Sequence, residues 1–135
     1  MLNEKKNIEK LSKFFVKIHD NIIENSIDKY DFKGIRDEAG LYYISYKILN
    51  EIIKKSDPII IASYCYQLFA VRHLFHEGNK RTAHVIAQMF LVSDNLEFDI
   101  DYEKAKDFII KIARKEKGFN EIKVWLKQHT SHRKR

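Results

Sequence analysis

The sequence contains few residues that break secondary structure, with only 4 glycines and 1 proline among 135 residues. An all-β sandwich or barrel needs a turn signal about every 8–12 residues, so this scarcity argues against that class. The single cysteine, Cys65, excludes an internal disulfide and a zinc site built from cysteines. No window of about 18 apolar residues is present, so we expect no membrane-spanning helix. The opening residues MLNEKKNIEK are polar and charged, which indicates no secretory signal and predicts a cytoplasmic protein.

The positive charge of the sequence is concentrated at one end. Lysine and arginine number 25 against 19 acidic residues, a formal net charge of +6. Such a balance suits an anionic partner, either nucleic acid, a nucleotide or an acidic protein segment. The last three residues, Arg133-Lys134-Arg135, supply half of this excess, and we expect residues 131–135 to form a disordered basic tail. The net charge by itself therefore does not predict nucleic-acid binding, and we expect no such partner.

Apolar residues recur at three- and four-residue steps through most of the sequence, which is the period of an α-helix. Asp57 and Pro58 are expected to begin a central helix that is apolar on nearly every side and extends to Phe75. Asp101 is expected to cap a later helix that Gly118 ends. The other predicted helices cover about residues 4–25, 40–55 and 80–93, and about ten residues after Asn120.

These patterns predict an all-α protein, with residues 1–135 forming a single compact domain of about six helices. Asn95 to Ile100 alternates as a strand does, but this segment is short. The segment from Asn25 to Ala39 has no helical period and is long for a connection between helices. Because long ordered loops often carry function, we interpret it as a candidate flap beside a substrate site.

The nine residues from His73 to Arg81, His-Leu-Phe-His-Glu-Gly-Asn-Lys-Arg, are the most informative part of the sequence. They precede a predicted helix start, where unpaired backbone N–H groups and the helix dipole favour an anion. Gly78 leaves room for a phosphate, and Asn79 can cap the helix and donate to an oxygen. Lys80 and Arg81 add two positive charges at the same place.

Two other side chains of this segment suggest chemistry. Glu77 offers a carboxylate beside the expected phosphates, which is how proteins often hold magnesium. His73 can take a proton from an attacking hydroxyl. Taken singly, His73 is more typical of a core histidine, and Glu77 of a charge cluster at a helix start. Those interpretations do not account for the glycine and asparagine between the charges, so the segment predicts an anion site.

The pattern His-x-Phe-x-Glu-Gly-Asn-Lys-Arg resembles the signature of the Fic/Doc family, H-x-F-x-(D/E)-(G/A)-N-(G/K)-R. The segments Ile18-His19-Asp20, Gly34-Ile35-Arg36-Asp37-Glu38 and Trp125-Leu126 are similar to its Doc (death-on-curing) branch. This resemblance, which covers most of the chain, implies a Fic-fold toxin that transfers part of ATP to a hydroxyl group of a protein target. It also implies roles for individual residues: His73 as the base, Glu77 as the Mg²⁺ ligand, and Gly78, Asn79 and Arg81 as the anion hole for the phosphates.

Two positions differ from family members that transfer AMP, which usually have glycine in place of Lys80 and a second arginine in place of His84. Lysine at the first position is typical of the Doc branch, whose members bind ATP in a reversed orientation and transfer its γ-phosphate. We therefore predict an ATP-dependent protein kinase that modifies a Ser or Thr hydroxyl. By the resemblance, its target is translation elongation factor Tu, and the outcome is arrested translation. Lys80 and His84 are expected to contact the nucleotide phosphates.

The sequence leaves two alternatives: an AMP transferase that uses the same residues, and a catalytically idle Fic-fold binding module. An RNA-cleaving helical toxin suits the charge, but the spacings from Arg72 to His76 and from Arg81 to His84 are shorter than such toxins use. The family's inhibitory pattern, (S/T)-x-x-x-E-(G/N), is not matched; the nearest segment begins with Asp20 where a hydroxyl residue belongs. We therefore expect a separate antitoxin protein, whose flexible segment folds into a groove on this chain.

Overall fold

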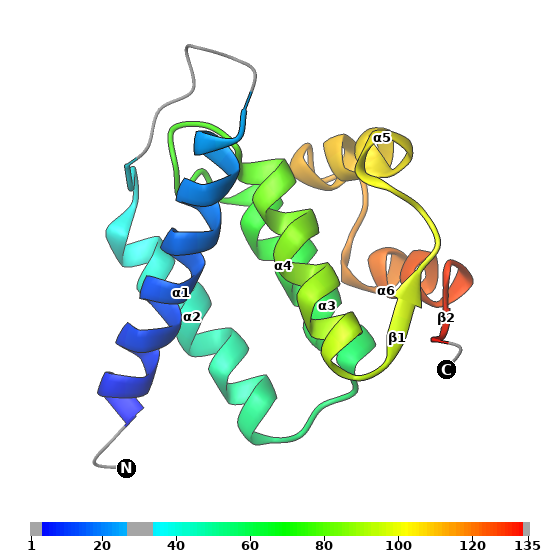
Figure 1. Cartoon of the computed structure of the whole chain (residues 1–135), viewed down its shortest axis with the longest axis horizontal. Helices are drawn as coiled ribbons and strands as arrows, with labels where there is room; N and C mark the ends of the chain where they lie inside the picture. The colour runs from blue at the N-terminus through cyan, green and yellow to red at the C-terminus, as the bar shows by residue number, and fades with distance from the viewer. Residues whose placement is uncertain (1–3, 27–33, 134–135) are drawn as a thin grey trace.

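The computed structural model describes residues 4–26 and 34–133. This part of the chain forms six helices and two short strands (Figure 1). The elements are α1 (Glu4–Glu24), α2 (Glu38–Ile53), α3 (Pro58–Val71), α4 (Asn79–Ser93), β1 (Leu96–Phe98), α5 (Tyr102–Ala113), α6 (Phe119–Gln128) and β2 (Thr130–His132). The prediction of an all-α fold is confirmed, because the two strands form only a small antiparallel pair.

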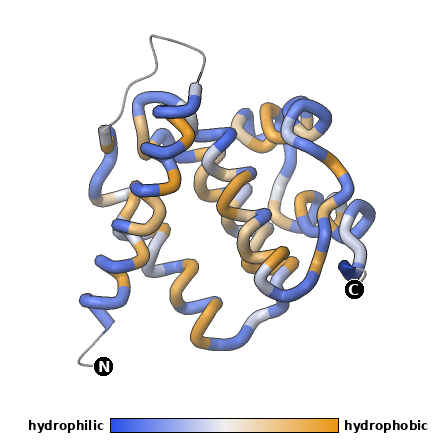
Figure 2. Tube along the Cα trace, viewed as in Figure 1, coloured by the Kyte–Doolittle hydropathy of each residue, from blue (hydrophilic) through white to orange (hydrophobic). Residues whose placement is uncertain are grey.

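The helices α3 and α4 form an antiparallel hairpin at the centre of the molecule, with α1 and α2 on one side and α5 and α6 on the other (Figure 1). The reason lies in the sequence of α3, which is apolar around most of its circumference and is covered from several directions. Figure 2 shows apolar residues along α3 and α4, while the connections at the periphery are mostly hydrophilic. None of the helices in the described ranges is long and apolar enough to cross a membrane.

The predicted helix starts are confirmed where an aspartate precedes them. The Asp57 carboxylate accepts a hydrogen bond from the Ile59 N–H at 2.8 Å, with Pro58 at the first helical position. The Asp101 carboxylate accepts one from the Lys104 N–H at 3.0 Å. Each cap satisfies a backbone donor that the helix itself leaves unpaired.

The end of the central helix differs from the prediction. α3 ends at Val71, four residues before Phe75, and Leu74 and Phe75 are extended and fully buried. The Leu74 carbonyl accepts hydrogen bonds from the Arg36 and Asp37 N–H groups, and Phe75 forms an isolated antiparallel bridge with Ile35. The apolar run of the sequence therefore extends past the end of α3 because Leu74 and Phe75 are buried, and not because they are helical. Of the candidate flap, residues 27–33 lie outside the described residues.

Two predictions at the C-terminal end are wrong. Gly118 does not end α5, which stops at Ala113; it occupies the N-cap position of α6 instead. Ser131 and His132 are not a disordered tail, because β2 pairs antiparallel with β1, and the Arg133 N–H donates to the Asn95 carbonyl. Backbone pairing with β1 orders residues whose side chains alone would not predict a strand. Residues 134–135 lie outside the described part of the chain.

Candidate functional site

The nine-residue segment singled out by sequence covers most of the connection between α3 and α4, at one end of the central hairpin, and the first three residues of α4 (Figure 1). The connection, residues 72–78, is referred to below as the 72–78 loop. It packs against the C-terminal half of α1, since His19 contacts Phe75 and Glu77. It also pairs with the segment before α2 through Ile35. Two separate stretches of the sequence thus hold the loop.

The first turn of α4 presents unpaired backbone donors. The first hydrogen bond of the helix runs from the Thr82 N–H to the Gly78 carbonyl at 2.9 Å. The N–H groups of Asn79, Lys80 and Arg81 have no hydrogen-bond partner among the described residues. Together with the helix dipole, three such donors make a site for a phosphate-sized anion.

Gly78 allows the sharp turn that aims these donors. Its φ of 79° lies in the left-handed region, which residues with a side chain adopt at a cost. A Cβ at this position would lie 3.1 Å from Ile23 Cδ1 and 3.5 Å from His19 Nε2. The glycine is therefore required both by the backbone conformation and by close packing against α1.

Asn79 has a different position from the one predicted. Its side chain does not cap α4, where Gly78 occupies the N-cap position without a side-chain bond. Instead the amide Nδ2 donates to the Phe75 carbonyl at 2.9 Å, and Oδ1 accepts from the Phe75 N–H at 3.1 Å. This pair of bonds closes the loop on itself, so the side chain braces the backbone while its own N–H remains available to an anion.

The two cations at the start of α4 have different surroundings. The guanidinium of Arg81 lies 4.2 Å from the centre of the Tyr102 ring, and its Nη2 is 3.7 Å from Glu103 Oε1. Arg81 is thus drawn toward the first turn of α5, although half of its side chain is exposed. Lys80 is partly buried and forms no ion pair with the described residues. Positive side chains at a helix N-terminus are unfavourable unless an anion binds there.

His73 and Glu77 lie within the 72–78 loop rather than on a helix. His73 is exposed, and its ring has no hydrogen-bond partner in the described part of the chain, so it is accessible to an incoming hydroxyl. Glu77 is partly buried and lies directly before Gly78 and the first turn of α4. No group of three or more histidine, cysteine or acidic side chains in the described ranges could hold a metal by itself. One carboxylate beside bound phosphates fits Mg²⁺, which usually keeps waters and phosphate oxygens as its other ligands.

His84, predicted to contact a phosphate, belongs to the core instead. It is 8% exposed, and the Tyr66 hydroxyl donates to its Nδ1 at 2.7 Å. Burial, reinforced by the positive charge of Arg81, lowers the pKa of His84 to about 4, so the ring is neutral near pH 7. A neutral ring bonded to Tyr66 supplies no positive charge to a phosphate, so these surroundings do not favour the phosphate contact, which stays a prediction.

His19, for which the sequence predicted no role, lies against the 72–78 loop. Its Nε2 lies 2.7 Å from the Glu77 carbonyl oxygen, and its ring stacks on Phe75. The spacing of His19 in the sequence could have indicated its burial, because Phe15, His19 and Ile23 follow one another at four-residue steps, and all three are buried on α1. A buried histidine needs a polar partner. Its partner, Glu77, lies 58 residues further along the chain and could not be identified from this spacing.

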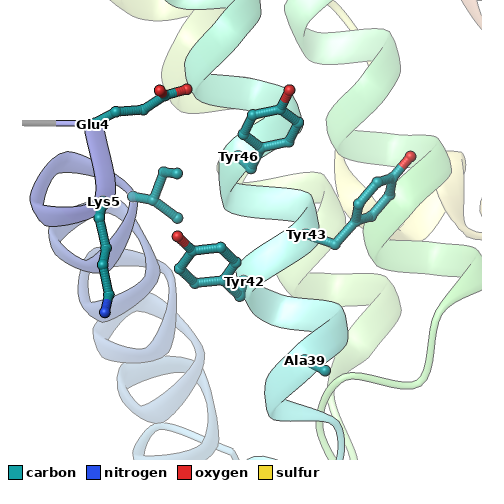
Figure 3. A pocket seen from close by; sticks show the side chains of 7 residues that line it. Glu4, Lys5, Ala39, Tyr42, Tyr43 and Tyr46 are labelled. Atoms are coloured by element: carbon teal, nitrogen blue, oxygen red, sulfur yellow. The ribbon is translucent and has the colours of Figure 1, made fainter. Parts of the chain in front are cut away.

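A separate hollow of about 540 Å³ lies between α1 and α2, lined by Glu4, Lys5, Ile8, Ala39, Tyr42, Tyr43 and Tyr46. Figure 3 shows the Tyr42 ring turned toward α1 and the Tyr43 ring turned away from it. The three tyrosines are each about two-fifths exposed. Tyr43 connects this surface to the loop, because the Arg72 guanidinium lies 4.8 Å from its ring centre.

Comparison with protein-family models matches residues 10–91 to the Fic/DOC family, a range that includes most of α1 and α4 and the whole of α2, α3 and the 72–78 loop. The chain therefore belongs to the Fic/DOC family. A search of curated proteins finds no match to the chain. Membership suggests a transferase that acts on a protein, and proteins of this family typically use ATP with a metal ion.

Proposed function

We propose that this protein is a Doc-type toxin that transfers the γ-phosphoryl group of ATP to a Ser or Thr hydroxyl of a protein target. The observation that carries the proposal is the arrangement at the start of α4. There, three N–H groups without a partner among the described residues and two cations follow directly on the loop that carries the exposed His73 imidazole and the Glu77 carboxylate. Phosphoryl transfer depends mainly on positioning and on stabilising negative charge, and these groups can supply both.

Each residue has a defined task in this proposal. His73 accepts the proton of the attacking hydroxyl, whose oxygen forms a bond to the γ-phosphorus while the bond to the β–γ bridging oxygen breaks and ADP leaves. The N–H groups of Asn79, Lys80 and Arg81, with the side chains of Lys80 and Arg81, stabilise the phosphate oxygens. Glu77 holds Mg²⁺, which when bound neutralises charge on the phosphates. Asn79 keeps the loop closed through Phe75.

Transfer of phosphate is favoured over transfer of AMP by the residues that distinguish the two patterns. Lys80 stands where AMP-transferring members usually have glycine. The position of their second arginine holds His84, which is buried and neutral and so adds no positive charge one turn into α4. A phosphate clamp that relies on two arginines is therefore incomplete here, which supports the Doc-type orientation of ATP.

Parallel reactions with α-³²P- and γ-³²P-labelled ATP test this choice directly. The purified chain is incubated with Mg²⁺ and purified elongation factor Tu, the target that the family resemblance suggests. We expect the γ label, but not the α label, to remain on the target protein. Retention of the α label would instead establish AMP transfer. Normal ATP binding with no labelling of that target or of any lysate protein would favour an idle binding module.

His73→Ala should abolish transfer, because the substitution removes the proposed base, and the other histidine of the loop does not occupy the histidine position of the signature. His76→Ala is the matched control: His76 is an exposed histidine of the same loop, outside the proposed phosphate contacts. We expect the control to keep most of the wild-type rate and both variants to keep the helical circular-dichroism spectrum. Full labelling of the target by His73→Ala would contradict the assignment of the base.

We also propose that an antitoxin protein restrains this activity, since the chain does not match the family's own inhibitory pattern. The tyrosine-lined hollow between α1 and α2 supports the proposal, because exposed aromatic surface is typical of protein interfaces. Co-expression with the product of a neighbouring gene, followed by co-purification and the labelling assay, tests it. An active enzyme in the copurified complex would argue against inhibition by that partner.

A further inference from the structure

We infer that His19 is a positioning residue for the candidate site: its Nε2–H fixes the backbone of Glu77, so that the Glu77 carboxylate and the donors of α4 face the nucleotide. This inference deepens the proposed function and rests on it for the effect on catalysis. The structural part, that the hydrogen bond from His19 to Glu77 helps to hold the 72–78 loop in place, can be tested without any activity.

The bond itself is short, and its donor is buried. His19 Nε2 lies 2.7 Å from the Glu77 carbonyl oxygen, and the side chain of His19 is completely buried, whereas Glu77 is half-buried. A carbonyl oxygen only accepts hydrogen bonds, so Nε2 carries the proton. Removing the donor leaves the half-buried carbonyl without this partner, which makes the bond a constraint on the loop.

The ring of His19 also fits the residues on either side of Glu77. It stacks on Phe75, with ring centroids 3.8 Å apart and planes within 8° of parallel. On the other side, a Cβ at Gly78 would approach its Nε2 to 3.5 Å. The ring of His19 is thus close to three residues of the loop, Phe75, Glu77 and Gly78. Asn79 fastens Phe75 from the α4 side, so the backbone is held from both directions.

Stacking and hydrogen bonding can be separated by two substitutions. His19→Phe keeps an aromatic ring against Phe75 but removes the donor. His19→Gln loses the ring but retains an N–H that can reach the Glu77 carbonyl. If the hydrogen bond positions the loop, glutamine restores what phenylalanine loses; if His19 only fills space, phenylalanine is the milder change.

Hydrogen exchange provides a readout that is independent of catalysis. Two amides of the peptide covering residues 73–82, those of Phe75 and Thr82, donate hydrogen bonds to described residues. We expect His19→Phe to speed their exchange about tenfold, the scale expected when a carbonyl inside a packed loop loses its donor, and His19→Gln to stay near wild type. Ser12→Ala is the control, because it removes a bond of α1 to Ser45 at 2.7 Å, away from the loop. It should leave exchange in this peptide unchanged.

The wild-type chain gives a second measurement that does not depend on how the variants fold. In ¹⁵N-histidine spectra, the Nε2 proton of His19 should be protected from solvent exchange, whereas the exposed rings of His73 and His76 should exchange rapidly. A rapidly exchanging or absent Nε2 proton at His19 overturns the inference.

In the transfer assay, we expect His19→Phe to lower kcat/KM about 10- to 100-fold, as loss of a group that orients a metal ligand does, and His19→Gln to recover most of it. Equal exchange rates in all variants, or a glutamine variant no better than phenylalanine, overturn the inference. A wild-type protein without transfer activity overturns the proposed function instead, and the exchange result then still decides whether His19 holds the loop.

Discussion

His84 shows how the surroundings of one residue affect the charge that it can carry. It follows Arg81 by three positions, yet its ring lies between the aromatic rings of Phe98 and Tyr102 and accepts a hydrogen bond from Tyr66. The Tyr66 hydroxyl in turn accepts a bond from Gln88 at 3.1 Å. Burial raises the pKa of Tyr66 and lowers that of His84, so both groups are uncharged near neutral pH.

The stability of the fold should therefore depend on the protonation of His84. Its pKa falls from 6.5 to about 4, lowered first by burial and then by Arg81, with Asp101 acting in the opposite direction. Between these values the unfolded chain binds the proton more readily, so the contribution is complete above pH 6.5 and is lost as the pH falls toward 4. We expect about 2 kcal/mol less stability at pH 4.5 than at pH 7 from this group.

Urea unfolding of the wild type and of His84→Gln at pH 4.5, 5.5 and 7 measures this effect. Glutamine can still accept the Tyr66 hydrogen bond but does not titrate in this range. The variant should lose less stability than the wild type as the pH falls, whatever its stability at pH 7. Identical pH dependence in the two proteins would show that His84 does not carry a lowered pKa.

The positions of groups could be predicted where they depend on neighbours in the sequence. The backbone donors of residues 79–81, which have no partner among the described residues, follow from a local motif at a helix start. The environment of His84 could not be predicted, because it is created by Tyr66, 18 residues away, and by β1 and α5. The same is true of the bond from His19 to Glu77. Local spacing predicts which groups are present, whereas the packing of distant elements decides what they contact.

The helices themselves were largely predictable, since amphipathic periods and aspartate caps are properties of short segments. The beginning of α3 and of α5 follows Asp57 and Asp101 as expected. The end of α3 was not predictable from hydrophobicity, because Leu74 and Phe75 are buried in an extended conformation that pairs with residues 35–37. Because Leu74 and Phe75 of the 72–78 loop are buried, the candidate site is held by packing as well as by its own hydrogen bonds.

The first turns of α4 and α5 meet at Arg81, so the proposed function predicts that their contact affects the affinity for the nucleotide. Tyr102 provides a ring against the guanidinium, and in this proposal the exposed carboxylate of Glu103 competes with phosphate for it. We expect Tyr102→Leu to weaken ATP binding about two- to fivefold through loss of the cation–π contact, and Tyr102→Phe to bind like the wild type. Glu103→Gln should change affinity in the other direction, by about twofold, because exposed ion pairs are weak.

Equilibrium titration of MgATP, followed by calorimetry, distinguishes these effects from general destabilisation. Arg81→Gln provides the reference, since it removes the group through which both neighbours act. In that background, the Tyr102 and Glu103 substitutions should have no further effect on the dissociation constant. Weaker binding in Glu103→Gln would contradict competition between its carboxylate and the nucleotide.

At the scale of the whole molecule, the central hairpin divides the chain into two groups of contacts. The side formed by α1 and α2 supports the 72–78 loop through His19 and Ile35. The side formed by α5, α6 and the β1–β2 pair encloses the aromatic cluster around Trp125, which stacks on Phe108 and meets Phe98 edge to face. Arg81 adds a contact between them, because it lies in the first turn of α4, directly after the loop, and its side chain contacts Tyr102 of α5.

The β2 strand should stabilise this second side, even though the sequence suggested a disordered tail. β2 pairs with β1 from Leu96 to Phe98, and the buried Phe98 joins Trp125 and His84. A chain ending at His129 loses this pairing, and we expect it to be less stable by about 1 kcal/mol, with Tm lower by about 3–6 °C. The control replaces Arg133, Lys134 and Arg135 with glutamine, which removes three charges but keeps β2, and should leave Tm unchanged. Fluorescence of Trp125, the single tryptophan, reports unfolding in all three proteins. Equal losses of Tm in the truncated and neutralised chains would show that charge, rather than strand pairing, accounts for the contribution of this segment.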